Sequence, residues 1–195
     1  MTDNSETLKA GRIRAMQNRL RAAGVPSPCW DLSASKTQRA FLRTTATTWA
    51  NSDERGSIKP GMFFHGRSDK QHETVALAAK EAVLAGLTAM HMPYNMLEMR
   101  LPAWQRAEGI PDFIYPLNEL FGRGLLAIHS VPPGYAVIDA ESRGYMDALA
   151  WIVSHLDHGG FLAICGDHPL EGRAEMDWPG EFLLPLRRYC NVYEV

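Results

Sequence analysis

The sequence predicts an α/β fold in which a parallel sheet is covered by helices on both faces. Short apolar runs alternate along the chain with longer segments whose apolar residues recur at helical spacing. The short runs are continuously apolar, which is typical of strands buried on both faces of a parallel sheet. The expected strands are residues 61–65, 87–92, 124–131, 161–165 and 191–195.

Helices are expected between these strands and ahead of the first one. Apolar residues at helical spacing, with Gly24, Gly86 and Gly159 at the ends of three of the segments, predict the boundaries. The polar stretch 66–73 is expected to be a loop, and we expect strands 61–65 and 124–129 to be neighbours. The expected helices are 9–23, a segment capped by Ser33 or Ser35 and ending near Asn51, 73–85, 94–107, 115–122 and 142–158.

Composition limits the class of protein. The chain has 195 residues, of which 46% are hydrophobic and 22% charged, as expected for one globular domain. A net charge of −2 gives no overall basic signal for nucleic acid. Cys29, Cys165 and Cys190 are far apart, which predicts buried free thiols in a reducing cytoplasm. No apolar run is long enough to cross a membrane, so we expect a cytoplasmic protein.

Five segments, taken in order, resemble a known family. They are AAGVP (22–26), GMFFHG (61–66), GLLAIHS (124–130), FLAICGDHPLE (161–171) and LRRYCNVYEV (186–195). Their order and spacing over about residues 20–195 resemble the DnaC/IstB-like AAA+ family of helicase loaders and transposition helpers. The resemblance implies a three-layer α/β/α P-loop NTPase-like domain at 57–195, with a short N-terminal helical extension at 1–56.

The phosphate loop of that family is degenerate here. A working loop has the pattern G-x-x-x-x-G-K-[ST], whose backbone N–H groups and lysine hold phosphate and whose hydroxyl holds Mg²⁺. In the corresponding stretch, 66–74, only Gly66 is retained. Gln71 or His72 takes the place of the lysine, and His72 or Glu73 takes the place of the hydroxyl.

Weak anion binding at this position is a separate prediction. Arg67 and Lys70 could attract an anion with the help of a helix N-terminus, while Asp69 and Glu73 would oppose it. The degenerate nucleotide or anion site predicted from the resemblance comprises Gly66, Arg67, Ser68, Lys70, His72, His129 and Asp167.

Three further elements of an ATPase are also missing. Strand 124–131 carries His129 and Ser130 where the family has acidic residues for Mg²⁺, and Asp167 stands where a neutral polar sensor is expected. Pro185 takes the place of an arginine, with Arg187 and Arg188 two and three residues further on. We therefore expect no ATP hydrolysis, assign no catalytic residue, and expect neither Mg·ATP nor another cofactor.

Histidines suggest a different chemistry at the same sheet edge. His65, His91 and His129 fall near the carboxyl ends of expected strands, where a parallel sheet binds its ligands. They could ligate a metal, but we interpret them first as hydrogen-bonded, partly buried side chains. We assign no metal, and the sequence contains no nucleophile motif. His155 and His158 are interpreted as charge complements at a solvated helix end.

The N-terminal helix is rich in arginine. This pattern is typical of a helix that contacts nucleic acid or an acidic partner, and equally of an amphipathic helix with a solvated basic face. We expect no contact with a membrane. Our leading hypothesis is a non-catalytic accessory or regulatory protein of DNA replication or transposition, whose partner is a replicative helicase or loader ATPase. The alternatives are a divergent ATP-binding helicase loader and a small-molecule or metal-dependent enzyme. The arginines concerned are Arg12, Arg14, Arg19 and Arg21.

Overall fold

A five-stranded parallel sheet lies at the centre of the protein, with the strand order β2-β3-β4-β1-β5. The computed structural model describes residues 3–31, 36–51, 58–106, 123–132, 142–166, 169–170 and 180–195. The strands are β1 (Gly61–His65), β2 (Ala89–Pro93), β3 (Leu125–Val131), β4 (Phe161–Gly166) and β5 (Cys190–Glu194). All five lie within two residues of the predicted strands.

The predicted pairing of 61–65 with 124–129 is wrong, because β4 lies between them. Leu162 is in register with Gly61 of β1 on one side and with Leu126 of β3 on the other. Residues 162–165 are fully buried. A strand this apolar gains most from a central position, where helices cover both of its faces.

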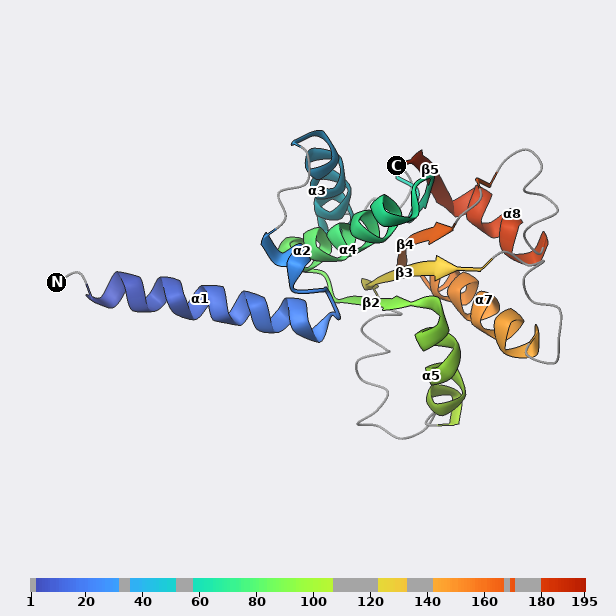
Figure 1. Cartoon of the computed structure of the whole chain (residues 1–195), viewed down its shortest axis with the longest axis horizontal. Coiled ribbons are helices and arrows are strands. Elements are labelled where there is room, and N and C mark those ends of the chain that lie inside the picture. The colour runs from blue at the N-terminus through green and yellow to red at the C-terminus, as the bar shows by residue number, and fades with distance from the viewer. Residues whose placement is uncertain are drawn as a thin grey trace.

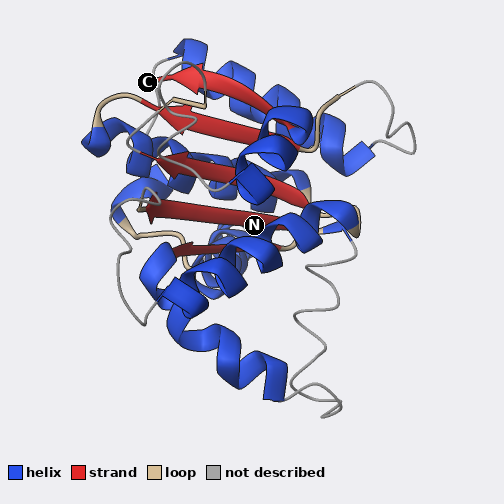
Figure 2. Ribbon diagram, turned by 90° about the vertical axis from the view of Figure 1, so that its right-hand side faces the viewer, coloured by secondary structure: helices blue, strands red, loops and turns tan. Residues whose placement is uncertain are grey.

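Helices cover both faces of the sheet (Figures 1 and 2). One face carries α2 (Pro28–Asp31), α3 (Lys36–Asn51), α4 (Ser68–Ala85) and the last turn of α1 (Asp3–Ala22). The other face carries α5 (Tyr94–Arg106), α7 (Ser142–Asp157) and α8 (Gly180–Tyr189). The three-layer prediction is confirmed over the described residues; the helix predicted at 115–122 lies outside them.

Alternate residues of each strand pack into two separate hydrophobic cores, one on each face of the sheet. In β1, Met62 and Phe64 pack under α4, whereas Phe63 packs under α7 and α8. This alternation follows from the two-residue period of a strand. Because both faces are covered, the continuous apolar runs of the sequence correspond to strands rather than to helices.

The N-terminal segment belongs partly to this body. The ring of Trp49 in α3 stacks on Phe161 of β4, with ring centroids 4.8 Å apart, and Leu20 of α1 is buried. The rest of α1 projects away from the sheet (Figure 1). The predicted boundary between residues 56 and 57 lies outside the described residues.

Several side-chain predictions can be compared with the structure. Cys29, Cys165 and Cys190 are free and buried, as predicted. His155 is not at a solvated helix end: it is fully buried, and its Nε2 lies 2.9 Å from the oxygen of Phe161. Burial lowers the pKa of His155 to about 4, so it is a neutral core residue. Within the described ranges, every helix is too short or too polar to pass through a bilayer.

Candidate functional site

The connection between β1 and α4 consists of Gly66 and Arg67 alone. The predicted loop over 66–73 is wrong, because α4 begins at Ser68 rather than at residue 73. Neither glycine nor proline occurs between Arg67 and Gly86, so nothing in this stretch opposes an early helix start. A phosphate loop needs four residues between its two glycines, and this junction has no room for them.

The end of β5 closes the junction from one side. The Val195 N–H donates to the oxygen of His65 at 2.8 Å, and the Arg67 N–H donates to the oxygen of Val195 at 3.0 Å. Gly66 has a φ of 122°, and a Cβ added there would collide with the Val195 oxygen. The Arg67 N–H, one of the backbone donors that would face a phosphate, is thus engaged within the fold.

Gln71 closes the junction from inside. Its side chain is 1% exposed, and its Nε2 donates to the oxygen of Gly66 at 2.9 Å. A neutral amide therefore stands at the position predicted to replace the phosphate-loop lysine, and it points back at the loop. An amide hydrogen-bonded in this way supplies no fixed positive charge to a polyphosphate.

The two cations predicted for the degenerate site are exposed. Arg67 precedes α4 as its N-cap residue, without a side-chain cap hydrogen bond, and the Lys70 Nζ lies 3.4 Å from the Glu73 carboxylate. Ser68 is the first residue of α4, with its side chain outside the described part, and Asp167 also lies outside it. Among the residues that the structure describes here, the side chains do not fit a nucleotide with Mg²⁺.

A different cluster occupies the neighbouring edge, where β3 ends. Ser130 has a φ of 60°, a left-handed conformation unusual for a residue with a Cβ, and the β3–β4 register shifts between Ile128 and Val131. The Ser130 Oγ lies 2.9 Å from Nδ1 of His129 and 3.0 Å from Nε2 of His72 on α4. One exposed hydroxyl is therefore held between two imidazoles.

His91 of β2 packs against this cluster through its ring. The ring centroids of His91 and His129 are 5.1 Å apart, and those of His72 and His129 are 4.6 Å apart. The His129 ring is therefore in contact with both of the other rings. The His91 Nδ1 lies 3.0 Å from the oxygen of Gly24. A carbonyl oxygen only accepts, so Nδ1 carries the proton and Nε2 is a bare acceptor. Within the described residues, this buried Nε2 has no hydrogen-bond partner.

The surroundings of two of these rings, His129 and His91, disfavour a positive charge. Burial, followed by the charges that His91 and His72 would carry, lowers the pKa of His129 to about 4. Burial also lowers the pKa of His91. A neutral imidazole has one N–H donor and one nitrogen acceptor, so His129 and His91 can each donate one hydrogen bond and accept another.

The metal-ligand set proposed from sequence does not assemble. His91 and His129 are in contact, but His65 ends β1, which β4 separates from β3. Among the described residues, no group of three or more His, Cys, Asp or Glu side chains is placed to hold a metal ion. The structure gives no support for the metal site.

The arginines near the chain end serve the fold. The Nε of Arg187 donates to the oxygen of Leu170 at 2.7 Å, and the Arg188 guanidinium lies over the Tyr189 ring at 5.2 Å. Pro185 lies inside α8. Pro185 therefore occupies the position where the family resemblance implies an arginine, and the two nearby arginines make contacts within the fold.

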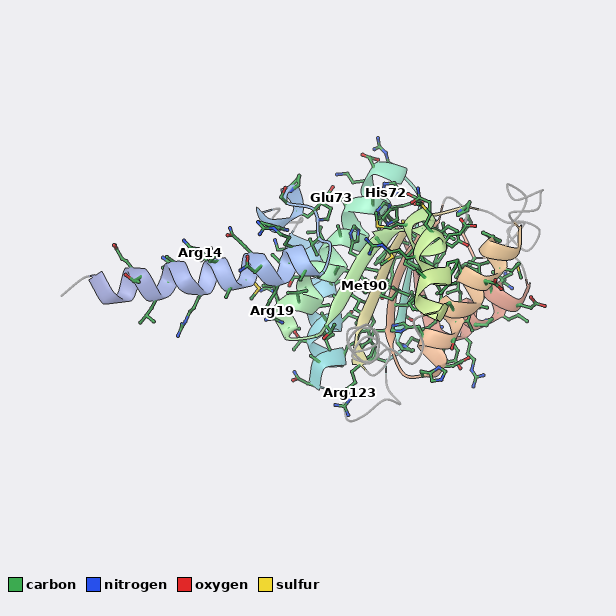
Figure 3. All side chains as sticks on the ribbon, turned by 90° about the horizontal axis from the view of Figure 1, so that it is seen from below. Arg14, Arg19, His72, Glu73, Met90 and Arg123 are labelled. Carbon is green, nitrogen blue, oxygen red and sulfur yellow. The ribbon has the colours of Figure 1, made fainter. Side chains whose placement is uncertain are left out.

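The four arginines of α1 lie apart from the sheet edge. All are exposed, and only Arg21 is seen near an aromatic ring, 5.7 Å over Trp30, among the described contacts. Figure 3 shows Arg14 on the projecting helix and His72 and Glu73 in the body. The arginines and the sheet edge are therefore separate regions. The contact of Ser130 with His72 could not be predicted from the sequence, because the two residues are 58 positions apart.

Comparisons with known proteins establish the fold. Neither a family model nor a curated protein sequence matches the chain. The chain is similar to the solved structure of AMPPCP-bound DnaA from Aquifex aeolicus, with a TM-score of 0.53, 10% sequence identity and 86% of this chain covered. The match covers 48% of that DnaA chain, so this protein spans about half its length. The five-stranded parallel sheet of this chain thus has an α/β fold similar to that of the DnaA structure, as predicted.

Proposed function

We propose that the protein is an accessory or regulatory factor of DNA replication or transposition that does not hydrolyse ATP. It acts by protein contact with a replicative helicase or a loader ATPase. The observation that carries this proposal is the two-residue junction of Gly66 and Arg67, which replaces a phosphate loop in an otherwise AAA+-like domain.

The junction argues against nucleotide binding on physical grounds. A polyphosphate needs several free N–H donors and a fixed cation, and each charged contact is worth about 1.5–3 kcal/mol. Here the Arg67 N–H is engaged by Val195, and Gln71 is neutral and engaged by Gly66. Losing several such contacts moves a micromolar site to millimolar or weaker, which is about 4 kcal/mol.

The projecting helix α1 supports a role in protein contact. Leu8 and Ile13 are 62% and 51% exposed, and Arg12 and Arg14 lie beside Ile13. A lone helix in water gains little stability from its own hydrogen bonds and gains more by packing its apolar side chains. We therefore assign α1 as the contact element, with the arginines directed at an acidic surface of the partner.

Nucleotide binding is the first test. Calorimetry and thermal unfolding are measured with ATP, ADP and Mg²⁺ at millimolar concentrations, and we expect no heat and no shift. Gln71→Lys, which restores a lysine without lengthening the junction, should also give no binding. Clear stabilisation of the wild type, or ATP turnover that is lost in Lys70→Ala, would favour the divergent helicase loader instead.

Partner capture is the second test. The tagged chain is used to recover proteins from the organism that encodes it, and we expect a replicative helicase or loader ATPase among those enriched. Leu8→Ser with Ile13→Ser should abolish the enrichment, while Ala10→Ser with Ala15→Ser on the same helix should preserve it. Recovery of neither protein, or equal recovery with both variants, would contradict the proposal.

DNA binding by α1 is tested separately. Fluorescence anisotropy with duplex DNA is measured from low to physiological salt, because each neutralised phosphate releases counterions and steepens the salt dependence. Changing Arg12, Arg14, Arg19 and Arg21 to alanine should abolish any such binding. No binding at low salt would leave protein contact as the role of this helix.

A further inference from the structure

The edge of the sheet at β3 holds a hydroxyl in a setting that the proposed function does not use. Ser130 is exposed, and its Oγ is within hydrogen-bond distance of two imidazole nitrogens on different elements, His129 of β3 and His72 of α4. A hydroxyl has one proton, so it donates to one ring and accepts an N–H from the other. One imidazole therefore accepts the hydroxyl proton in a hydrogen bond, and the other donates its own N–H to the oxygen.

We propose that Ser130 is a nucleophile, that His72 is its general base, and that the sheet edge accepts a small ester. This activity goes beyond the accessory role proposed above and is independent of it.

The two imidazoles are not equivalent, and this assigns the direction of proton transfer. Among the described rings, His129 packs between His72 and His91 and is half-buried, so an added positive charge on it is poorly tolerated. His129 therefore donates its Nδ1–H to the Ser130 Oγ, and this donor stabilises a developing alkoxide. His72, at the more open side of the cluster, accepts the hydroxyl proton at Nε2.

The backbone of Ser130 gives independent support. A φ of 60° is strained for a residue with a Cβ, and such residues concentrate at functional sites. Here the strained residue follows the last regular pair of β3 and β4, at Ile128, and its hydroxyl is exposed. The conformation places the hydroxyl against His72, whose helix is far away in sequence.

His91 provides a second observation that points to a ligand. Its side chain is 9% exposed, and its Nε2 has no partner within the described part of the chain. A buried acceptor without a donor destabilises the fold, because it has lost its hydrogen bond to water without gaining another. This unpaired acceptor lies directly beside His129, so the polar cluster around Ser130 extends into the interior of the sheet edge.

The chemical step conserves atoms and charge. The Ser130 Oγ attacks the ester carbonyl carbon, its proton passes to the His72 Nε2, and the bond between the carbonyl carbon and the alkoxy oxygen breaks. The leaving alkoxide takes the proton from His72 as an alcohol. Water then attacks the acyl-serine, with His72 again taking and returning the proton, and releases a carboxylic acid.

Covalent labelling tests the nucleophile. Diisopropyl fluorophosphate forms a bond between Oγ and phosphorus and releases fluoride, so mass spectrometry can locate the adduct. We expect one adduct, on Ser130. Hydrolysis of p-nitrophenyl acetate by the same protein gives a rate, and we expect His72→Gln to lower both the labelling and hydrolysis rates by at least about 100-fold.

Two variants serve as controls. Ser130→Gly removes the hydroxyl but accepts a φ of 60°, so it should fold and show neither labelling nor turnover. Ser154→Ala removes another Ser–His pair, in which Oγ lies 3.3 Å from Nδ1 of His158 on α7, and should leave both rates unchanged. The proposal is overturned if Ser130 is not labelled, if His72→Gln reacts within twofold of the wild type, or if Ser130→Gly retains the turnover. None of these outcomes depends on nucleotide binding or partner capture.

Discussion

Two parts of the same sheet edge have opposite characters. At the β1–α4 junction the chain is closed: Gly66, Arg67 and Gln71 direct their polar groups at one another or at Val195. At the end of β3, Ser130 and two imidazoles are open to solvent on one side. One edge of a parallel sheet can therefore carry a closed junction, whose polar groups bond to one another, beside a strand whose polar groups remain open to solvent.

The largest expected effect concerns closure at Gly66. Gly66→Ala should destabilise the fold by about 3 kcal/mol, because it adds backbone strain and a collision with Val195. Urea unfolding measures the loss. Gly86→Ala is the matched control: its φ is 97°, but an added Cβ meets nothing within 4 Å, so about 1 kcal/mol is expected. Equal losses would show that β5 does not fix the junction.

The buried amide is expected to matter somewhat less. Gln71→Met keeps most of the volume but removes the hydrogen bond to Gly66, which should cost about 1–2 kcal/mol. Thr74→Val removes a hydroxyl that donates to the oxygen of Lys70 within the same helix, and should cost about 0.5 kcal/mol or less. If chemical denaturation ranks the two variants the other way, Gln71 is not what holds the junction closed.

The scaffold was predictable from sequence because its signals are local. The apolar runs at 61–65 and 161–165 and the glycine at residue 86 identify their elements without knowledge of their partners. The order of the strands was not predictable in this way, and the expected β1–β3 pairing failed because no local pattern says that β4 lies between them.

The candidate sites depended on contacts that sequence spacing does not reveal. The early start of α4 at Ser68 removed the loop in which an anion site was expected. His129 was considered as a metal ligand with His65, but the fold instead brings it to His72 and Ser130. A strand ending in His-Ser is the one local signal that could have directed attention to the hydroxyl.

The imidazole side of the edge predicts a pH dependence. The pKa of His129 is about 4 in the fold against an ordinary value of 6.5, so the unfolded chain binds more protons between these values. The free energy of unfolding should therefore fall as the pH drops from about 6.5 to 4. Discounted for its exposure, the contribution of His129 is about 1 kcal/mol.

His129→Gln isolates this contribution. Unfolding free energies of both proteins are measured at several values between pH 4 and 7, and the variant should lose about 1 kcal/mol less over that range. His155 changes stability in the same direction in both proteins, so it cancels in the difference. Parallel curves for the two proteins would mean that His129 is not kept neutral by its surroundings.

The smallest effect is expected at Lys70, and it decides whether the closed side of the edge retains any anion site. The ion pair of Lys70 with Glu73 is 3.4 Å long and solvated on both sides, so Lys70→Ala should change stability by less than about 0.5 kcal/mol.

Thermal unfolding with 10–50 mM phosphate, matched in ionic strength with chloride, tests the site itself. A bound anion would stabilise the wild type in proportion to ln(1 + [L]/Kd), and Lys70→Ala would remove that gain. We expect no phosphate-specific gain in either protein, because the Lys70 charge is directed at Glu73 and the nearby Arg67 N–H is already engaged by Val195. A gain in the wild type that Lys70→Ala removes and Lys70→Arg restores would show that the junction, though closed to nucleotides, still holds a single phosphate.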